Sequence, residues 1–167
     1  MRSAILPLVC LVFLAASCSE SNPKVLTDSG TAALGSGDAP AALKSFDAAL
    51  SHMDAKHPDF LRASMGKCQA LARQNPIEAK QEFLDLARKH TDLVKEPDFA
   101  TIIRELVRKR AISEATEVVQ AGMKSFPQSP TMKAILNEVG DEAKKSSVDP
   151  AALDKLKGLG YAGADDQ

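Results

Sequence analysis

The sequence predicts an all-α fold, a repeat array of helical hairpins, and three observations lead to this prediction. Apolar residues recur at helical spacing: Phe99, Ile102, Ile103 and Leu106 lie at positions i, i+3, i+4 and i+7 of one stripe. Segments of similar pattern return along the chain at a nearly constant interval. Proline, glycine and asparagine stand between the apolar stretches, where they favour helix ends.

The repetition is clearest in two columns of residues. The three similar segments cover residues 30–50, 66–87 and 103–123. When the segments are aligned, two columns of residues recur after 37 and then 36 positions. One column holds small residues: Ala42, Ala79 and Ala115. The other holds larger apolar residues: Phe46, Phe83 and Val119. Because both columns keep one register, the segments are expected to be repeated helical hairpins.

Seven helices are expected in this region, covering residues 25–36, 39–53, 59–74, 76–90, 98–109, 111–125 and 130–145. Gly37-Asp38 and Asn75-Pro76 divide the first two hairpins. Prolines at positions 58, 97 and 127 mark the boundaries between hairpins, because proline lacks a backbone donor and discourages continuation of a helix. Residues 25–145 are therefore expected to form the repeat domain.

A short helix is also expected near the C-terminus, in the segment 146–167. Asp149 is a good N-cap, Pro150 suits the first helical position, and Leu153 and Leu156 share a face before a glycine ends the helix. We expect this helix to cover the apolar edge of the last hairpin, and residues 165–167 to fray. A recognition tag for a partner is the alternative interpretation.

The first 17 residues are interpreted as an export signal peptide. An apolar run from Ala4 to Ala16 follows the positive charge of Arg2, and it is shorter than the about 20 apolar residues that a membrane-spanning helix needs. The small residues before Cys18 resemble a bacterial lipobox, which implies cleavage before Cys18 and acylation of this residue. Residues 18–24 would then tether the domain to the membrane; simple secretion to the periplasm is the alternative.

The charge balance argues against nucleic acid as a partner. Loss of the signal removes Arg2 and leaves 20 basic and 22 acidic residues, a net charge of −2 with histidine neutral.

By resemblance to enterobacterial sorting signals, Ser19 favours the outer membrane, with the domain facing the periplasm.

No catalytic, metal or cofactor site is expected. His52 and His57 lie five residues apart, a spacing that does not place both on one helix face. Cys68 is expected to be a packed hydrophobic residue, because Met65 and Leu71 flank it at helical spacing. With Cys10 lost in the signal and Cys18 acylated, Cys68 has no disulfide partner.

The repeated segments resemble tetratricopeptide repeats, whose period is about 34 residues. The first segment carries the best match, with a small residue at the helix crossing, a Gly-Asp turn, and alanine, phenylalanine and alanine in the second helix. The resemblance covers roughly residues 25–145. It implies a repeat core made of Gly30, Ala42, Phe46, Ala49, Gly66, Ala79, Phe83, Ala115, Val119 and Gly122.

The resemblance also implies a peptide-binding groove, because in this family the first helix of each hairpin lines the concave side of the array. Carried over to this chain, the lining residues are Thr27, Thr31, Leu34, Phe60, Ala63, Lys67, Leu71, Ala100, Arg104, Val107 and Arg108. Two arginines one turn apart suit a peptide with carboxylates. A solvated basic face without a ligand is the alternative.

These observations predict a membrane-anchored protein-interaction module, a scaffold or adaptor in the bacterial cell envelope. The expected partner is a protein or peptide in the envelope, with no nucleic acid and no small-molecule substrate. An accessory subunit of an envelope assembly machine is one alternative, by similarity to tetratricopeptide lipoproteins of outer-membrane protein assembly. A small envelope enzyme is the contrasting alternative. The scattered histidines and the cysteine do not form a recognisable catalytic motif in the sequence.

Overall fold

The computed structural model describes residues 22–146 and 150–163. These residues form eight α-helices and no strand, so the all-α prediction is confirmed. The helices are α1 (Pro23–Gly35), α2 (Ala39–Leu50), α3 (Phe60–Gln74), α4 (Pro76–Lys89), α5 (Glu96–Arg108), α6 (Ile112–Ser125), α7 (Pro130–Ser146) and α8 (Pro150–Gly158). The first seven lie where the sequence predicts them, with small differences at their ends.

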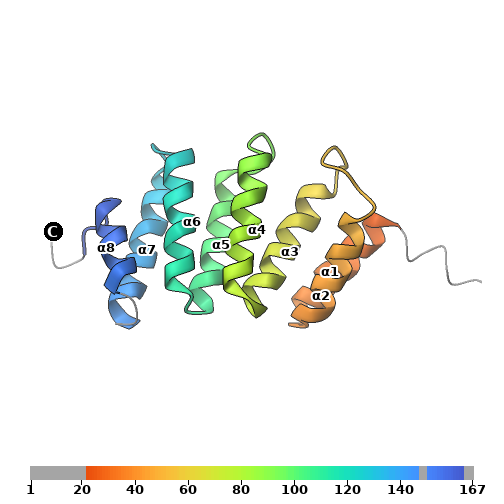
Figure 1. The fold of residues 1–167 in the computed structure, drawn as a ribbon, viewed down its shortest axis with the longest axis horizontal. Coiled ribbons are helices and arrows are strands. Elements are labelled where there is room, and N and C mark those ends of the chain that lie inside the picture. Colours follow the sequence, from red (N-terminus) through yellow and green to blue (C-terminus); the bar gives the residue numbers. More distant parts are fainter. Residues whose placement is uncertain (1–21, 147–149, 164–167) are drawn as a thin grey trace, which may run out of the picture.

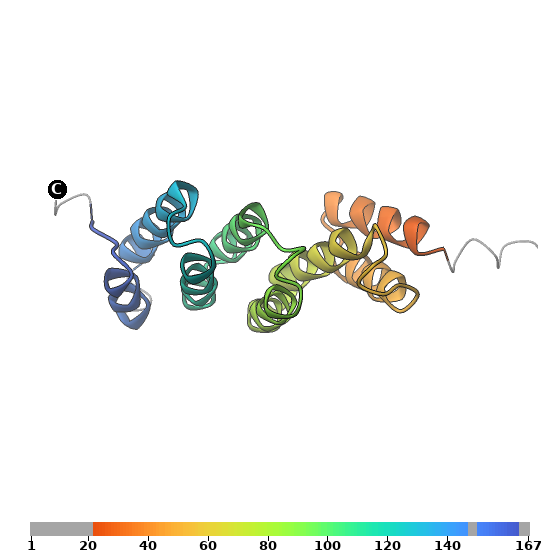
Figure 2. The ribbon, with the colours of Figure 1, turned by 90° about the horizontal axis from the view of Figure 1, so that it is seen from above.

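The helices stand side by side in a row (Figure 1), and the chain reverses its direction at each connection. Seen from above, the odd-numbered helices form one layer and the even-numbered helices the other (Figure 2). Within the odd layer, α3 contacts α1 and α5, and α5 contacts α7; within the even layer, α6 contacts α4 and α8. No Cα atom of α2 comes within 8 Å of one in α4, so the even layer is interrupted between these two helices.

Short polar side chains begin several of the helices, as the sequence suggests. The side-chain oxygens of Asn22, Asp38 and Asn75 accept hydrogen bonds from backbone N–H groups in the first turns of α1, α2 and α4, at 3.0, 3.0 and 3.3 Å. These bonds satisfy donors that have no partner within the helix. The helix α1 begins at Pro23, two residues before the expected start, so the predicted tether is shorter at this end.

The ten residues of the predicted repeat core are all buried. Phe46 of α2 lies against Gly30 of α1 and Gly66 of α3, where a Cβ atom on either glycine would overlap its ring. The close approach of three helices therefore depends on the absence of side chains at these two positions. Gly122 has a similar relation to Met132.

The buried apolar residues form two clusters. The smaller cluster, around Phe46, joins α1 and α2 to one face of α3. The larger cluster starts at Met65 and Cys68 of α3 and continues to Tyr161 beyond α8. The helix α3 thus contributes to both clusters, and it is the element that joins the first hairpin to the rest of the row.

The C-terminal helix α8 packs against α6 and α7, with Leu156 buried. Tyr161 follows it and lies over Gly140, and its hydroxyl donates a hydrogen bond to Asp141 at 2.8 Å. The predicted helix after Asp149 is therefore present, and it covers part of the last hairpin. The predicted N-cap Asp149 and the tail 165–167 lie outside the described residues.

The N-terminal predictions also fall outside the described part of the chain. The signal peptide 1–17, Cys18 and residues 19–21 of the tether are not described. Among the helices of residues 22–146 and 150–163, none is both long and apolar enough to cross a membrane.

Candidate functional site

The predicted groove residues lie on the odd layer, but they do not form one surface. Three of them are exposed: Thr31, Arg104 and Arg108. Five are buried in or beside the core: Thr27, Leu34, Ala63, Leu71 and Ala100. Val107 is partly buried against the larger cluster, while Phe60 and Lys67 line a cavity on the opposite side of α3, between α2 and α4.

On α3, the predicted lining differs from the outward face in the structure by a rotation about the helix axis. Residues 60, 63, 67 and 71 follow one helical stripe, and the structure turns this stripe toward the core and the even layer. The stripe that faces outward on the odd layer starts one residue later, at Leu61, and continues through Met65 and Gln69. Successive residues of a helix are about 100° apart, so a shift of one residue changes the exposed face.

A groove does exist on the odd layer, and we call it the α1–α3 groove. It has a volume of about 420 Å³ and is lined by Thr31, Leu34, Phe46, Pro58, Leu61, Arg62, Met65, Gly66, Gln69 and Asp98. Leu34, Leu61 and Met65 give it an apolar floor between the two helices. Two residues of the predicted lining, Thr31 and Leu34, contribute to it, and its other residues were not among the predicted lining.

Arg62, at the edge of this groove, is held by two carboxylates. Its guanidinium donates hydrogen bonds to Asp28 of α1 at 2.7 Å and to Asp59 at 2.9 and 3.2 Å. Hydrogen bonds from Lys24 and Arg62 lower the pKa of Asp28, so this carboxyl group stays ionised. The charge of Arg62 is therefore compensated within the protein.

Gln69 is the polar group of the groove that has no such partner. Among the described residues, nothing forms a hydrogen bond with its side-chain amide, and the residue is partly exposed beside Met65 and Leu34. The nearby hydroxyl of Thr31 already donates to the carbonyl of Thr27 at 2.8 Å. The groove thus combines an apolar floor with one neutral amide that offers both a donor and an acceptor.

The two arginines expected to form a basic lining are paired with glutamates. Arg104 Nε lies 3.4 Å from Glu138 of α7. Arg108 forms an ion pair with Glu105, whose side chain is 6% exposed. Arg73 also approaches Glu105, at 3.5 Å, and donates a hydrogen bond to the carbonyl of Leu34 at 2.6 Å. The predicted pair of free basic donors is therefore not present in the described residues.

These contacts belong to a wider set of ion pairs between neighbouring helices. The pairs on the odd layer are Asp28–Arg62, Arg73–Glu105 and Arg104–Glu138; those involving the even layer are Asp47–Lys67, Lys67–Glu82 and Lys80–Glu117. The partners on the odd layer lie 32 to 34 residues apart in the sequence. A search for opposite charges at about the repeat interval would have found them.

The described residues hold no group of three or more histidine, cysteine, aspartate or glutamate side chains that could bind a metal ion. Cys68 is fully buried, and burial raises the pKa of its thiol to about 12. A thiol with this pKa is protonated near neutral pH and is a poor nucleophile.

Comparison of the chain with protein-family models, with curated proteins and with solved structures finds no match. Its function therefore has to be inferred from its own residues and geometry.

Proposed function

We propose that this chain is a tetratricopeptide-like repeat domain that binds a partner protein through the α1–α3 groove. The observation that carries the proposal is the groove itself, with apolar side chains from two helices beside an unpaired amide. A protein-binding groove combines these features, because apolar contacts give affinity and a few polar groups fix the orientation of the ligand.

The burial pattern supports the repeat interpretation. Ala42, Ala79 and Ala115 are fully buried at equivalent places in α2, α4 and α6, the second helices of the expected hairpins. Phe46, Phe83 and Val119 lie one turn later in the same helices and are also buried. Stacked hairpins of one kind bury equivalent positions, because each hairpin covers a face that its neighbour leaves open.

The groove favours a partner segment with apolar side chains and little charge. Arg62 is paired with aspartates, and Arg104 and Arg108 are paired with glutamates, so a peptide rich in carboxylates would find no uncompensated cation among them. Gln69 can exchange hydrogen bonds with the backbone amide of a bound segment. The partner expected from the sequence, an acidic peptide, is therefore replaced by a neutral, apolar one.

The proposed acylation of Cys18 would place the domain close to a membrane of the bacterial envelope. Five steps of the chain separate Cys18 from Pro23, and they span at most about 18 Å when extended. A partner that is itself part of the envelope, near the membrane surface, suits this short distance. The proposed role is that of a scaffold or adaptor, without catalysis.

Photo-crosslinking tests this function. A photoreactive amino acid at Leu61, in the floor of the groove, should crosslink one envelope protein in intact cells. The same substitution at Ile77, which is 56% exposed on α4, is the matched control and should not. The variant Leu61→Asp should reduce the capture of that protein at least tenfold with an unchanged circular dichroism spectrum. Equal crosslinking from both positions, or capture by a folded Leu61→Asp variant at the level of the unmodified protein, would contradict the proposal.

A further inference from the structure

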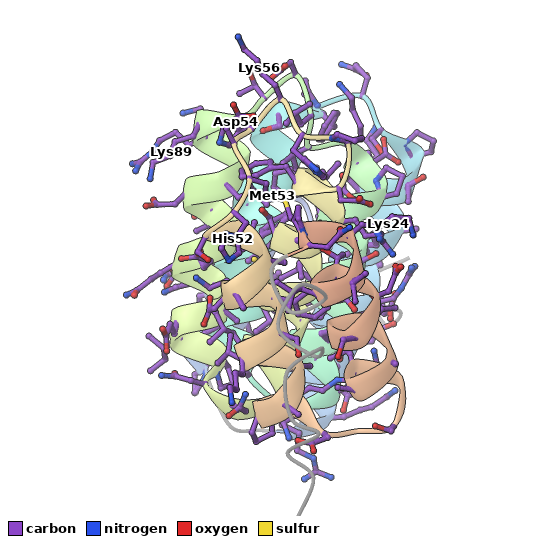
Figure 3. The ribbon with its side chains drawn as sticks, turned by 90° about the vertical axis from the view of Figure 1, so that its right-hand side faces the viewer. Lys24, His52, Met53, Asp54, Lys56 and Lys89 are labelled. Atoms are coloured by element: carbon purple, nitrogen blue, oxygen red, sulfur yellow. The ribbon has the colours of Figure 1, made fainter. Side chains whose placement is uncertain are left out.

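The row of helices is open on one side between α2 and α4. These two helices do not contact each other, and a cavity of about 270 Å³ lies between them. Figure 3 views the row from its α1–α2 end: His52 and Asp54, which follow α2, lie on the same side of the molecule as Lys89 of α4, whereas Lys24 of α1 lies on the other side. On the odd layer, α3 contacts both α1 and α5. The row is therefore continuous on its odd side and interrupted on its even side at this place.

The side chain of Lys67 spans the interrupted side. Its ammonium group, carried by α3, lies 3.1 Å from Asp47 of α2 and 3.0 Å from Glu82 of α4. Burial alone would lower the pKa of Lys67, but the hydrogen bonds to Glu82 and Asp47 outweigh it and raise this pKa, so the group stays charged. The cation therefore attracts one carboxylate on each side of the gap and links α2 to α4 where the helices themselves do not meet.

The charge of Lys67 decides the sign of the force across the gap. Without it, Asp47 and Glu82 would face each other with oxygen atoms at most about 6 Å apart, and like charges at this distance repel each other. Both carboxylates are about half exposed, so water weakens this repulsion without removing it. Asp85 and Lys89 also line the cavity, but they pair with each other along α4, at 3.6 Å, and do not span the gap.

The helix α3 connects the two parts of the row that this force would move. It packs on the first hairpin through Ala63 and Ala70, in the smaller cluster, and on the rest of the row through Cys68 and Leu71, in the larger one. Because α1 and α2 pack on each other, they would move together. Widening the gap breaks no contact between α2 and α4, so the continuous odd layer can serve as the pivot of a hinge motion.

We infer that Lys67 is a strap that holds α2 and α4 at their present separation, and that the row of helices bends open at α3 when the charge of this strap is removed. The bend changes the angle between the first hairpin and the helices α4 to α8, while every helix stays folded. The inference rests on the Lys67 contacts and on the missing contact between α2 and α4. It does not depend on the proposed binding of a partner in the α1–α3 groove.

Pulsed electron-resonance distances between spin labels in the full chain, in detergent micelles, test this inference. Labels attached to non-natural amino acids at two exposed positions, Lys44 of α2 and Gln81 of α4, report the width of the gap. Lys67→Met removes the charge and should increase the mean distance and broaden its distribution, with an unchanged circular dichroism spectrum. Adding Glu82→Gln to Lys67→Met removes the repulsion and should bring the distance back toward its original value. High salt should do the same, because the Debye length falls to about 3 Å at about 1 M.

Lys80→Met is the matched control. Lys80 pairs with Glu117 at 2.7 Å between α4 and α6, but these helices also contact each other directly. Labels at Gln81 and at the exposed Gln120 of α6 should therefore keep their distance in this variant. If Lys67→Met does not fold, Lys67→Gln carries the same test.

Three results would overturn the inference. The first is an unchanged distance across the gap in a folded variant without the Lys67 charge. The second is a widening that persists both with Glu82→Gln and in high salt. The third is an equal widening between α4 and α6 in Lys80→Met.

Discussion

The packing of Phe46 between two glycines predicts a reversal in the effect of one substitution. In Gly66→Ala, the new Cβ atom would overlap Cζ of Phe46 and lie 2.6 Å from Cε1. In Phe46→Leu, these ring atoms are gone. We therefore expect Gly66→Ala to destabilise the protein when residue 46 is phenylalanine and to stabilise it when residue 46 is leucine.

The magnitudes follow from two opposing contributions. Alanine is favoured over glycine by about 1 kcal/mol inside a helix, because glycine loses more backbone entropy on folding. Overpacking in a filled core costs about 1–3 kcal/mol. With Phe46 present, Gly66→Ala should lower the free energy of unfolding by up to about 2 kcal/mol, the overpacking cost less the helix gain. With leucine at position 46, only the helix gain remains, and the free energy of unfolding should rise by up to about 1 kcal/mol. The coupling energy between the two sites then equals the overpacking cost, about 1–3 kcal/mol, within the range for contacting residues.

The four proteins of this double-mutant cycle can be compared by urea unfolding. The chain has no tryptophan, so far-UV circular dichroism is the appropriate signal. Gly35→Ala is the matched control, because a Cβ atom at this exposed helical glycine would meet nothing within 4 Å. Its effect should be neutral or slightly stabilising in both backgrounds. Additive effects of the Gly66 and Phe46 substitutions, within about 0.5 kcal/mol, would refute the packing argument.

Three further predictions concern a turn, a thiol and the anchor. Arg110 has a φ of 57°, in the left-handed region that favours glycine, so Arg110→Gly should raise the free energy of unfolding by about 1 kcal/mol in the same urea assay. Burial raises the pKa of the Cys68 thiol to about 12, so its contribution to the stability of the fold is complete below about pH 9 and is lost as the pH rises toward 12. Cys68→Ala should therefore reduce the alkaline loss of stability in urea melts from pH 8 to 11. An unchanged pH dependence would contradict this prediction. Cys18→Ala should abolish incorporation of a fatty-acid probe, and persistent labelling would exclude the proposed anchor.

The positions of the helices could be predicted from the sequence because their signals are local. Asn22, Asp38 and Asn75 cap the helices that they precede, and the sequence shows such residues directly. The buried columns around Phe46 and Phe83 were also predictable, since a shared register identifies the face that each helix buries. These features need no knowledge of how distant segments meet.

The candidate sites were harder to predict because they depend on how neighbouring helices are rotated and spaced. Whether Lys67 or Gln69 faces the odd layer is decided by the packing of α3 against helices on both sides. The pairing of Arg104 and Arg108 depends on carboxylates that the structure brings near them. The cavity between α2 and α4 lies where these two helices do not contact each other, and the composition of the helices does not reveal it.

The division of the core into two clusters bears on how far the domain can reach. The first hairpin, α1 and α2, packs on α3 through the smaller cluster, so it is the element expected to unfold locally while α3 to α8 stay folded. Native-state hydrogen exchange would detect this as a separate group of amides. Local unfolding would lengthen the flexible chain to 42 steps between Cys18 and Phe60, with an average span of roughly 32–39 Å for a flexible coil in place of the proposed short tether. Helices α3 to α8 would then reach well away from the proposed lipid anchor, but the α1–α3 groove, which needs α1, would be lost in this state.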